Sequence, residues 1–478
     1  MNLRISALVA IALLIVVALW SLLPAPAQAQ FTQQAKLVGT DAVGKADQGI
    51  SVSISGDGNT AIFGGNGDSD GTGAVWVFTR SGGVWNQQGP KLVGTGAIGP
   101  YAAHQGGSVA ISSDGNTAIL GSATDDNFAG AAWVFIRSDG VWTQQAKLVG
   151  TGAIGPNVEQ GVSVALSSDG NTAIVGGPDD NPAGGTPQSP VGAAWVFTRS
   201  GEMWTQQAKL VGTDAVGSGQ GYSVSLSADG NTAIVGGFFD NPSGAAWVFT
   251  RSGGMWSQQG PKLVGTGATG DALQGISVSL STDGNTALVG GWGDDNYAGA
   301  TWVFTRSAGT WSQQGAKLVG TGAIGPRVFQ GYSVSLSADG NTGLVGGYGD
   351  DNRLGAAWVF TRERGAWSQQ GNKLVGTGVL GAFGGAWQGA SVSLSGDGST
   401  AIVGGPLDNS DVGNGGVGAA WVFAQPPVFA GTPGKANCHG QSVSSLARKY
   451  SGLNSAAAAL GFPDVSALQN AILMFCEG

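Results

Sequence analysis

The sequence predicts an all-β fold: a seven-bladed β-propeller of four-stranded blades, closed by the N-terminal strand and followed by a small α-helical, disulfide-linked C-terminal domain. Three markers predict this fold, because each recurs seven times at intervals of about 55 residues. The composition agrees, since 87 glycines, 11% charged residues and 42% apolar residues suit short strands joined by turns around a core. The markers are Lys-Leu-Val-Gly starting at Lys36, Lys91, Lys147, Lys209, Lys262, Lys317 and Lys373; Asp-Gly at Asp57, Asp114, Asp169, Asp229, Asp283, Asp339 and Asp397; and Trp-Val-Phe at Trp76, Trp133, Trp195, Trp247, Trp302, Trp358 and Trp421.

Each repeat contains four strand signals separated by turns. The first reads Gly-x-Ser-Val-x-Leu-Ser and alternates with period two, and an Asp-Gly-Asn-Thr hairpin turn leads into the second, Ala-Ile-Val-Gly-Gly. The third, Ala-Ala-Trp-Val-Phe-Thr-Arg, places Trp and Phe on one face, where we expect the core. The fourth, Trp-x-Gln-Gln-x-x-Lys-Leu-Val, carries Gln and Lys that suit a solvent-facing edge.

The repeats begin and end out of phase with the blades. Residues 31–39 form a fourth strand with no blade before it, and the seventh unit stops after its third strand at Phe423. We therefore expect residues 31–39 to complete the last blade, because both end blades would otherwise leave an unpaired strand edge. The propeller is predicted to span residues 30–424, followed by a linker over 425–434.

The N-terminus has the features of an export signal. Arg4 precedes a long apolar run over 5–23, and small residues then offer cleavage after Ala27 or Ala29. We expect residues 1–29 to be a signal peptide, with the alternative that the apolar run is kept as an anchor. Either way the protein is predicted to be secreted, periplasmic or at the cell surface, with no membrane span once the signal is cleaved.

The charge distribution excludes nucleic acid as a partner. The formal net charge is −9, and the basic residues are scattered singly and form no stripe. This acidic balance is compatible with solubility or with cation binding. We expect the protein to be a monomer.

The repeated motifs resemble the FG-GAP repeat family, whose best-known members are the propellers of integrin α subunits. The Phe-Gly-x-Ser-Val opening of the family appears here as Gln-Gly-x-Ser-Val, for example from Gln160 to Val164, and its Gly-Ala-Pro appears as Gly-Gly-Pro ending at Pro178 and Pro406. Gly-Ala-Ala-Trp-Val-Phe matches the Gly-x-Val-Tyr-Val-Phe strand of the family. The resemblance covers about residues 31–424 and implies a seven-bladed propeller that binds ligands on one face.

One departure from the family concerns calcium. Calcium-binding members carry alternating Asp and Asn before the Asp-Gly, whereas Ser or Ala fills most of those positions here. Because calcium takes six to eight oxygen ligands, one Asp in each hairpin is too few. We interpret these hairpins as structural turns and expect no cofactor, with weak calcium binding at the rim left open as an alternative.

Variation among the seven copies is concentrated in the loops between the second and third strands and between the fourth strand and the next blade. In antiparallel blades these loops share one face, which integrin propellers, by resemblance, use for ligands. Aromatic residues are frequent there and suit protein or sugar contacts, although they could instead pack down over the blade interfaces. The candidate ligand-binding residues are Tyr101, Phe128, Phe238, Phe239, Trp292, Tyr297, Phe329, Tyr348, Phe383 and Trp387.

The same loops repeat an acidic Asp-Asp-Asn element. Its side chains could bond their own backbone in tight turns, or they could bind a cation weakly. No metal site is assigned with these residues, and the candidates are Asp125, Asp126, Asp179, Asp180, Asp294, Asp295, Asp350 and Asp351.

Catalytic motifs are missing from the sequence. The only two histidines, His104 and His439, lie in different domains and outside any nucleophile motif. A pair of loop carboxylates could cleave glycosides, but nothing distinguishes one pair among seven similar loops. We therefore predict no catalytic residues and a protein that is not an enzyme.

Residues 435–478 differ from the repeats and are predicted to be helical. Segments 442–450 and 455–460 have helical patterns, and an amphipathic helix follows Asp464, a plausible N-cap. Cys438 and Cys476 bracket this small domain and should form a disulfide in an exported chain. Its role, as a partner-docking domain or as a cap on the propeller, stays open.

The sequence thus predicts a secreted or cell-surface binding or adhesion protein that contacts an extracellular protein or carbohydrate through one variable face. The alternatives are a polysaccharide-acting enzyme and a purely structural envelope protein. Ligand identity is not encoded in any motif.

Overall fold

The computed structural model describes residues 30–99, 102–181, 190–217, 219–380, 384–409, 416–426, 429–449, 452–460 and 462–477. The predicted signal peptide over 1–29 lies outside these residues, as do the candidate ligand-binding residues Tyr101 and Phe383. Within the described ranges, no helix is both long and apolar enough to cross a membrane.

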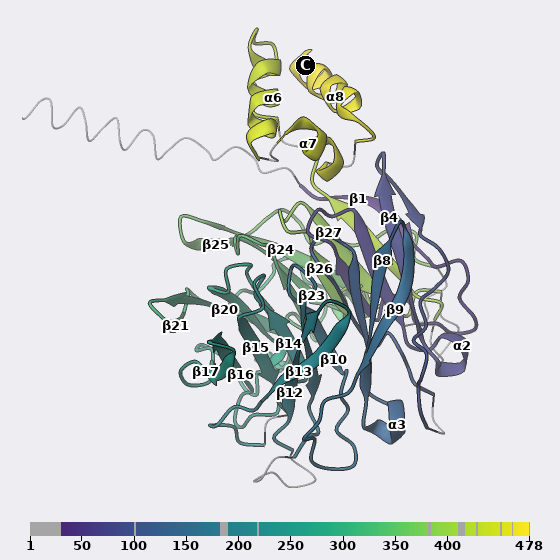
Figure 1. Cartoon of the computed structure of the whole chain (residues 1–478). Helices are drawn as coiled ribbons and strands as arrows, with labels where there is room; N and C mark the ends of the chain where they lie inside the picture. Colours follow the sequence, from purple (N-terminus) through teal and green to yellow (C-terminus); the bar gives the residue numbers. More distant parts are fainter. Residues whose placement is uncertain are drawn as a thin grey trace, which may run out of the picture.

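Seven antiparallel four-stranded sheets form the blades of a propeller, as predicted (Figure 1). The first six blades are, in chain order, β2 (Ser51–Ile54), β3 (Thr60–Gly65), β4 (Ala74–Ser81) and β5 (Val84–Gln87); β6 (Ser108–Ile111), β7 (Thr117–Ser122), β8 (Ala131–Ser138) and β9 (Val141–Leu148); β10 (Ser163–Leu166), β11 (Thr172–Gly177), β12 (Ala193–Ser200) and β13 (Met203–Leu210); β14 (Ser223–Leu226), β15 (Thr232–Gly237), β16 (Ala245–Ser252) and β17 (Met255–Gln258); β18 (Gln274–Leu280), β19 (Thr286–Gly291), β20 (Ala300–Ser307) and β21 (Thr310–Gln313); β22 (Ser333–Leu336), β23 (Thr342–Gly347), β24 (Ala356–Glu363) and β25 (Ala366–Gln369). The seventh combines β26 (Ser391–Leu394), β27 (Thr400–Gly405) and β28 (Ala419–Ala424) with β1 (Thr32–Leu37).

The ring is closed by the N-terminal strand, as the phase of the repeats predicts. β1 pairs antiparallel with β28, with Lys36 opposite Trp421 and Leu37 opposite Ala420. Seven backbone hydrogen bonds also run round the axis from one first-to-second turn to the next, and the last joins Gly396 N–H to the Gly56 carbonyl at 2.9 Å. The propeller is therefore closed both by the pairing of β1 with β28 and by the ring of hydrogen bonds between the turns.

The tryptophans of the third strands form the centres of the cores between blades. All seven are fully buried, and each indole N–H donates a hydrogen bond, as Trp302 does to the Thr266 carbonyl at 2.8 Å. The glycine of Lys-Leu-Val-Gly packs directly on this ring, because a Cβ on Gly265 would lie 2.0 Å from Trp302 Cδ1. Two of the three markers therefore meet in one packing contact.

The fourth strands are less regular than the sequence predicts. β1, β9 and β13 run through to the Leu of Lys-Leu-Val, but β5, β17, β21 and β25 stop at the first Gln. In those four blades an extra glycine, for example Gly315 with φ of 74°, follows the second Gln. The left-handed residue interrupts the ladder, and Leu318 rejoins it as an isolated bridge to Thr301.

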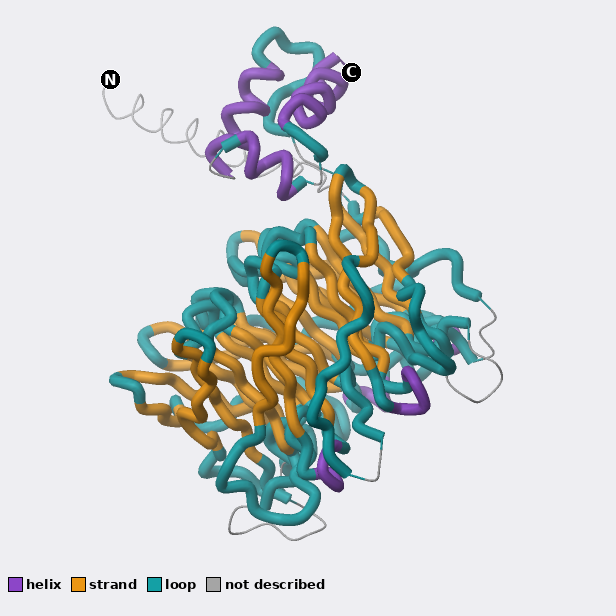
Figure 2. Tube along the Cα trace, turned by 45° about the vertical axis from the view of Figure 1, so that its right-hand side comes forward, coloured by secondary structure: helices purple, strands orange, loops and turns teal. Residues whose placement is uncertain are grey.

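The C-terminal residues form a separate small helical cluster above the propeller (Figure 2). It contains α6 (Cys438–Lys449), α7 (Leu453–Ala459) and α8 (Val465–Glu477), and its core includes Leu446, Leu468 and Ile472. The predicted disulfide joins Cys438 and Cys476, and the Asp464 carboxylate accepts a hydrogen bond from Ala467 N–H at 2.7 Å, as an N-cap does.

Candidate functional site

The two loop families that vary in sequence lie together on one face, which we call the variable face. A glycine in each second-to-third loop bridges to the Gln of the next Gln-Gly, as Gly299 does to Gln330. The Asp-Gly turns and the third-to-fourth turns lie on the opposite face, which we call the uniform face, and Figure 1 shows the C-terminal helices on that side, away from the loop turns α2 (Asp68–Gly71) and α3 (Asp125–Phe128).

The uniform face is built from internal hydrogen bonds, in agreement with the interpretation of its hairpins as structural turns. In blade 5 the Asp283 carboxylate accepts from Ser281 Oγ and from Asn285 N–H at 2.9 Å. Burial alone would raise the pKa of Asp283, but these hydrogen bonds hold the pKa below its ordinary value. The Arg306 guanidinium donates to Asn285 Oδ1 at 2.8 Å and lies over Trp311.

One aspartate in each second-to-third loop forms a buried ion pair with the lysine of Lys-Leu-Val-Gly. Lys317 Nζ lies 2.5 Å from Asp294 Oδ2, and the other carboxylate oxygen of Asp294 accepts from Thr269 N–H at 2.7 Å. The expectation that these lysines face solvent is therefore wrong, since their ammonium groups tie the fourth strand to two loops. The seven pairs are Lys36–Asp408, Lys91–Asp68, Lys147–Asp125, Lys209–Asp180, Lys262–Asp240, Lys317–Asp294 and Lys373–Asp350.

These ion pairs separate the predicted cation ligands into two groups. Asp125, Asp180, Asp294 and Asp350 are committed to lysines, whereas Asp126, Asp179, Asp295 and Asp351 lie outside the pairs and nearer to solvent. Among the described residues, no three His, Cys, Asp or Glu side chains gather as metal ligands. Calcium takes six to eight oxygen ligands, and cation binding at the rim stays a prediction.

The structure brings four of the predicted aromatic residues into one row on blades 5 to 7, which we call the aromatic strip. Tyr297 lies 6.0 Å from Phe329, Phe329 stacks on Tyr348 at 4.8 Å, and Tyr348 lies 5.0 Å from Trp387, all between ring centroids. Trp292 packs behind the strip, 5.4 Å from Phe329. Tyr297 is 40% exposed and the other three rings are half-buried, so the strip is partly exposed to solvent and partly packed against neighbouring side chains.

Three residues of the strip have backbone conformations that disfavour a side chain. The φ angles of Tyr297, Phe329 and Trp387 are 71°, 60° and 61°, in the left-handed region that glycine adopts freely. The equivalent position to Tyr297 in blade 1 is Gly71, and the equivalent to Trp387 in blade 4 is Gly219. Each bulky residue costs about 1–2 kcal/mol there relative to an unstrained backbone. The position before Gln-Gly is left-handed in all seven blades and also carries Asp47, His104, Glu159 and Leu273, so this conformation belongs to the repeat.

The remaining predicted aromatics lie apart from the strip. Phe238 is buried against Tyr222 in blade 4, and its neighbour Phe239 is 63% exposed. Phe128 is half-buried in the turn α3. The predicted set thus divides into one continuous strip and separate contacts elsewhere on the rim.

Sequence reasoning missed Tyr222 and Tyr332, which line the variable-face mouth of the central channel, a cavity of about 200 Å³. Both occupy the variable position of Gly-x-Ser, where other blades carry Ile, Val, Ala or Gly, and this contrast was the available signal. Burial, with the nearby Tyr332, Glu159 and Tyr348, raises the pKa of Tyr222 to about 12. These phenols therefore stay neutral at physiological pH.

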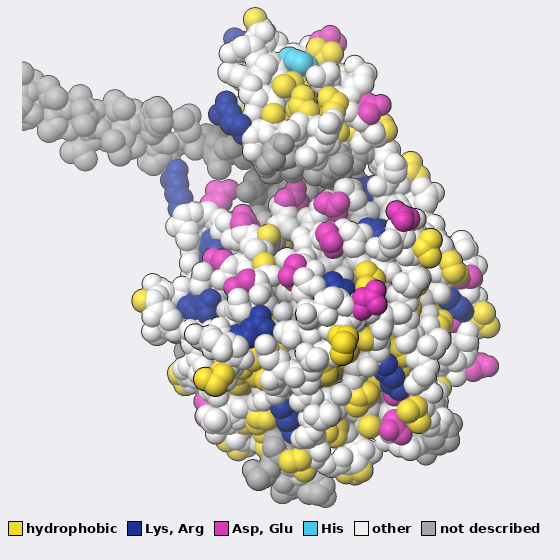
Figure 3. Space-filling model, viewed as in Figure 1, with side chains coloured by type: hydrophobic (Ala, Val, Ile, Leu, Met, Phe, Trp, Pro, Cys, Tyr) yellow, Lys and Arg dark blue, Asp and Glu magenta, His cyan; other side chains and the backbone are white. Residues whose placement is uncertain are grey.

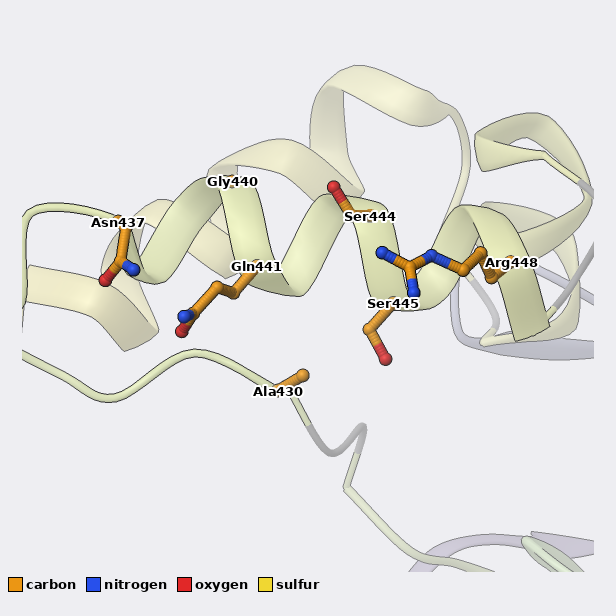
Figure 4. A pocket seen from close by; sticks show the side chains of 7 residues that line it. All are labelled: Ala430, Asn437, Gly440, Gln441, Ser444, Ser445 and Arg448. Carbon is orange, nitrogen blue, oxygen red and sulfur yellow. The ribbon is translucent and has the colours of Figure 1, made fainter.

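A groove lies away from the variable face, in the C-terminal helical cluster (Figure 4). It has a volume of about 890 Å³ and lies between the segment at Ala430 and helix α6, where Asn437, Gln441 and Arg448 line it. Its lining offers one cation and several amide and hydroxyl groups, and no pair of groups suited to acid–base chemistry.

The fold and the arrangement of its loops define a seven-bladed β-propeller with one structural face and one diversified face. Residues 204–249 match the family model described as FG-GAP repeat. This match begins at a fourth strand, β13, and ends in the third strand of the next blade, β16, so it has the same phase as the run of propeller strands from β1 to β28. The other six units carry the same sequence markers as this matched FG-GAP repeat. No curated protein matches it.

Proposed function

We propose that the protein is a secreted or cell-surface binding or adhesion protein, monomeric and non-enzymatic, that contacts an extracellular protein or glycan through its variable face. An FG-GAP propeller suits binding in general. The disulfide between Cys438 and Cys476 supports an extracellular location, because such bonds persist in oxidising compartments.

The aromatic strip is the observation that carries the proposal. Large side chains at Tyr297, Phe329 and Trp387 are kept on left-handed backbone that favours glycine. Residues held in sparsely populated backbone conformations cluster at ligand sites. Flat rings with polar edges are the side chains that dominate binding to proteins and provide stacking surfaces for sugar rings.

The charge of the surface fits a site of limited size. Figure 3 shows acidic and basic side chains interspersed over the visible face of the molecule, without one large patch of either sign. The visible face therefore offers no single large charged patch as a binding site.

The test is a screen of the full-length protein against arrays of glycans and of extracellular proteins. We expect binding that falls at least tenfold in Tyr297→Ala and Trp387→Ala, since truncated central aromatic residues typically cost over 1.4 kcal/mol. Met255→Ala is the matched control, because Met255 is 77% exposed on the uniform face. Binding that survives both strip variants but is lost in the control would contradict the proposal and place the site on the uniform face.

A further inference from the structure

Each end of the aromatic strip carries a guanidinium group. The Cζ atom of Arg327 lies 5.5 Å from the ring centroid of Tyr297, and that of Arg353 lies 5.8 Å from the ring centroid of Trp387. Arg327, the four rings of the strip and Arg353 therefore follow one another in this order. Arg327 lies in the loop that leads from blade 5 to blade 6, and Arg353 in the second-to-third loop of blade 6.

These two arginines differ from the arginines of the uniform face. Arg306 and its five equivalents are each held by side-chain hydrogen bonds, as Arg306 is by Asn285 at 2.8 Å and Gln259 at 3.0 Å. Arg327 and Arg353 are exposed, and neither side chain makes an ion pair or hydrogen bond with the described residues. Among the described residues their ten N–H donors have no partner, and they can bind a ligand.

The backbone at Arg353 is left-handed. Its φ is 69°, close to the 67° and 71° of the equivalent Phe128 and Tyr297, whereas blade 1 has Gly71 with φ of 87° at this position. An exposed side chain on a left-handed backbone gains little packing to offset the strain. The net charge of the chain is −9, and these two cations lie at the two ends of one aromatic row.

We infer that the aromatic strip with Arg327 and Arg353 binds an acidic polysaccharide, a chain of sugar rings that carry carboxylate or sulfate groups. This inference rests on the proposed function and names its ligand class. The rings of Tyr297 and Trp387 stack on the apolar faces of sugar residues, and each guanidinium binds an acidic group through paired hydrogen bonds. An acidic group at each end of the strip requires a ligand several sugars long, which a polysaccharide supplies.

The test compares acidic oligosaccharides with neutral counterparts of the same sugar. Hexagalacturonate and its full methyl ester form the carboxylate arm, and dextran sulfate and dextran form the sulfate arm. Binding to the full-length protein is measured by calorimetry for the hexasaccharides and by affinity electrophoresis for the dextrans, at low and high salt. We expect preference for the acidic member of at least one pair, and a preference that declines as salt rises.

The arginine variants test the ligand class, and the variants of the strip test the proposed function. Arg327→Gln and Arg353→Gln should each weaken binding to the acidic member roughly three- to tenfold and leave the neutral member unchanged. Arg364→Gln, which removes an exposed arginine of the uniform face, is the matched control and should change neither. Circular dichroism melting of each variant establishes that the fold is kept.

Equal binding of acidic and neutral members, or an acidic preference that persists in both arginine variants, would overturn the inference. If none of the four saccharides binds but Trp387→Ala abolishes binding to a protein on the array, the proposed function stands and the acidic polysaccharide is wrong. If Trp387→Ala and Tyr297→Ala change no binding of any kind, the proposed function fails as well.

Discussion

Lys36 in the first strand forms a 2.6 Å ion pair with Asp408, which lies in a loop of the last blade. The other six blades make the same pair within one stretch of chain, for example between Lys262 and Asp240. Ring closure therefore needs no special device, because the N-terminal strand makes the contacts that every fourth strand makes.

Removal of residues 30–37 should leave blade 7 with three strands and an exposed edge on β28. We expect a lower melting temperature and association of the protein through the open edge, measured by calorimetry and by light scattering. A control chain that restores the sequence of β9 at the N-terminus should recover the parent values, since β9 carries the same Gln-Gln-Ala-Lys-Leu. A deletion variant that melts like the parent would show that β1 contributes nothing to closure.

Removing one partner of a buried ion pair should destabilise the protein more than replacing both partners. Lys317→Ala leaves the Asp294 carboxylate, 1% exposed, without its cation and should cost about 3–5 kcal/mol in the free energy of unfolding. Lys317→Met combined with Asp294→Asn should cost less, because the amide oxygen can still accept from Thr269 N–H. Urea unfolding measures both, and a double variant less stable than the single one would contradict this account.

The raised pKa of Glu159 should make the stability of the protein fall as the pH rises. The lowered pKa values of aspartates in the Asp-Gly turns, such as Asp283, have the opposite effect. Burial, and then the nearby Asp179 carboxylate, raise the pKa of Glu159 in the folded protein. A carboxyl group with a raised pKa holds its proton more tightly when folded, so its contribution to stability is complete below the unfolded pKa, about 4.3. That contribution is lost as the pH rises through the folded pKa.

Glu159→Gln should therefore be more stable than the parent at neutral pH and equal to it below about pH 4. Urea unfolding across this pH range measures the difference, and Glu202→Gln on the uniform face is the control. A variant that is less stable than the parent at neutral pH would mean that the Glu159 carboxylate is paired when folded.

We expect the C-terminal helices to unfold independently of the propeller when the disulfide is removed. It closes a loop with a sequence separation of 38, for which chain entropy amounts to about 4 kcal/mol. Cys438→Ser with Cys476→Ser should abolish the helical signal of this cluster near 37 °C and leave the melting of the propeller unchanged. Calorimetry and NMR of the double variant measure the two parts separately, and a propeller that melts earlier would show that the helices stabilise it.

The fold could be predicted from the sequence because three markers repeat and each reports one structural contact. Lys-Leu-Val-Gly and Trp-Val-Phe meet where Gly265 packs on Trp302, and the Asp-Gly turn is a closed hydrogen-bond motif at Asp283. The irregular fourth strands were missed because one inserted glycine, such as Gly315, has a small effect on the sequence pattern and a large effect on backbone pairing.

The site could be predicted only as a set of variable aromatic residues. Which of them meet depends on contacts between loops of different blades, such as Tyr348 with Trp387, and no sequence spacing encodes these contacts. Lys317 was placed at a solvent-facing edge because its partner, Asp294, is distant along the chain. Arg327 and Arg353 were not singled out because their role depends on which rings lie beside them.

The central claim is that ligands bind the variable face at the aromatic strip. Hydrogen–deuterium exchange of the full-length protein, with and without a binder obtained from the arrays, tests it most directly. We predict that the binder slows exchange in residues 292–299, 327–332, 348–355 and 386–390 and leaves the uniform-face turns near Asp139, Gly253 and Ala308 unchanged. Slower exchange in those turns, with none around Tyr297 and Trp387, would contradict the claim.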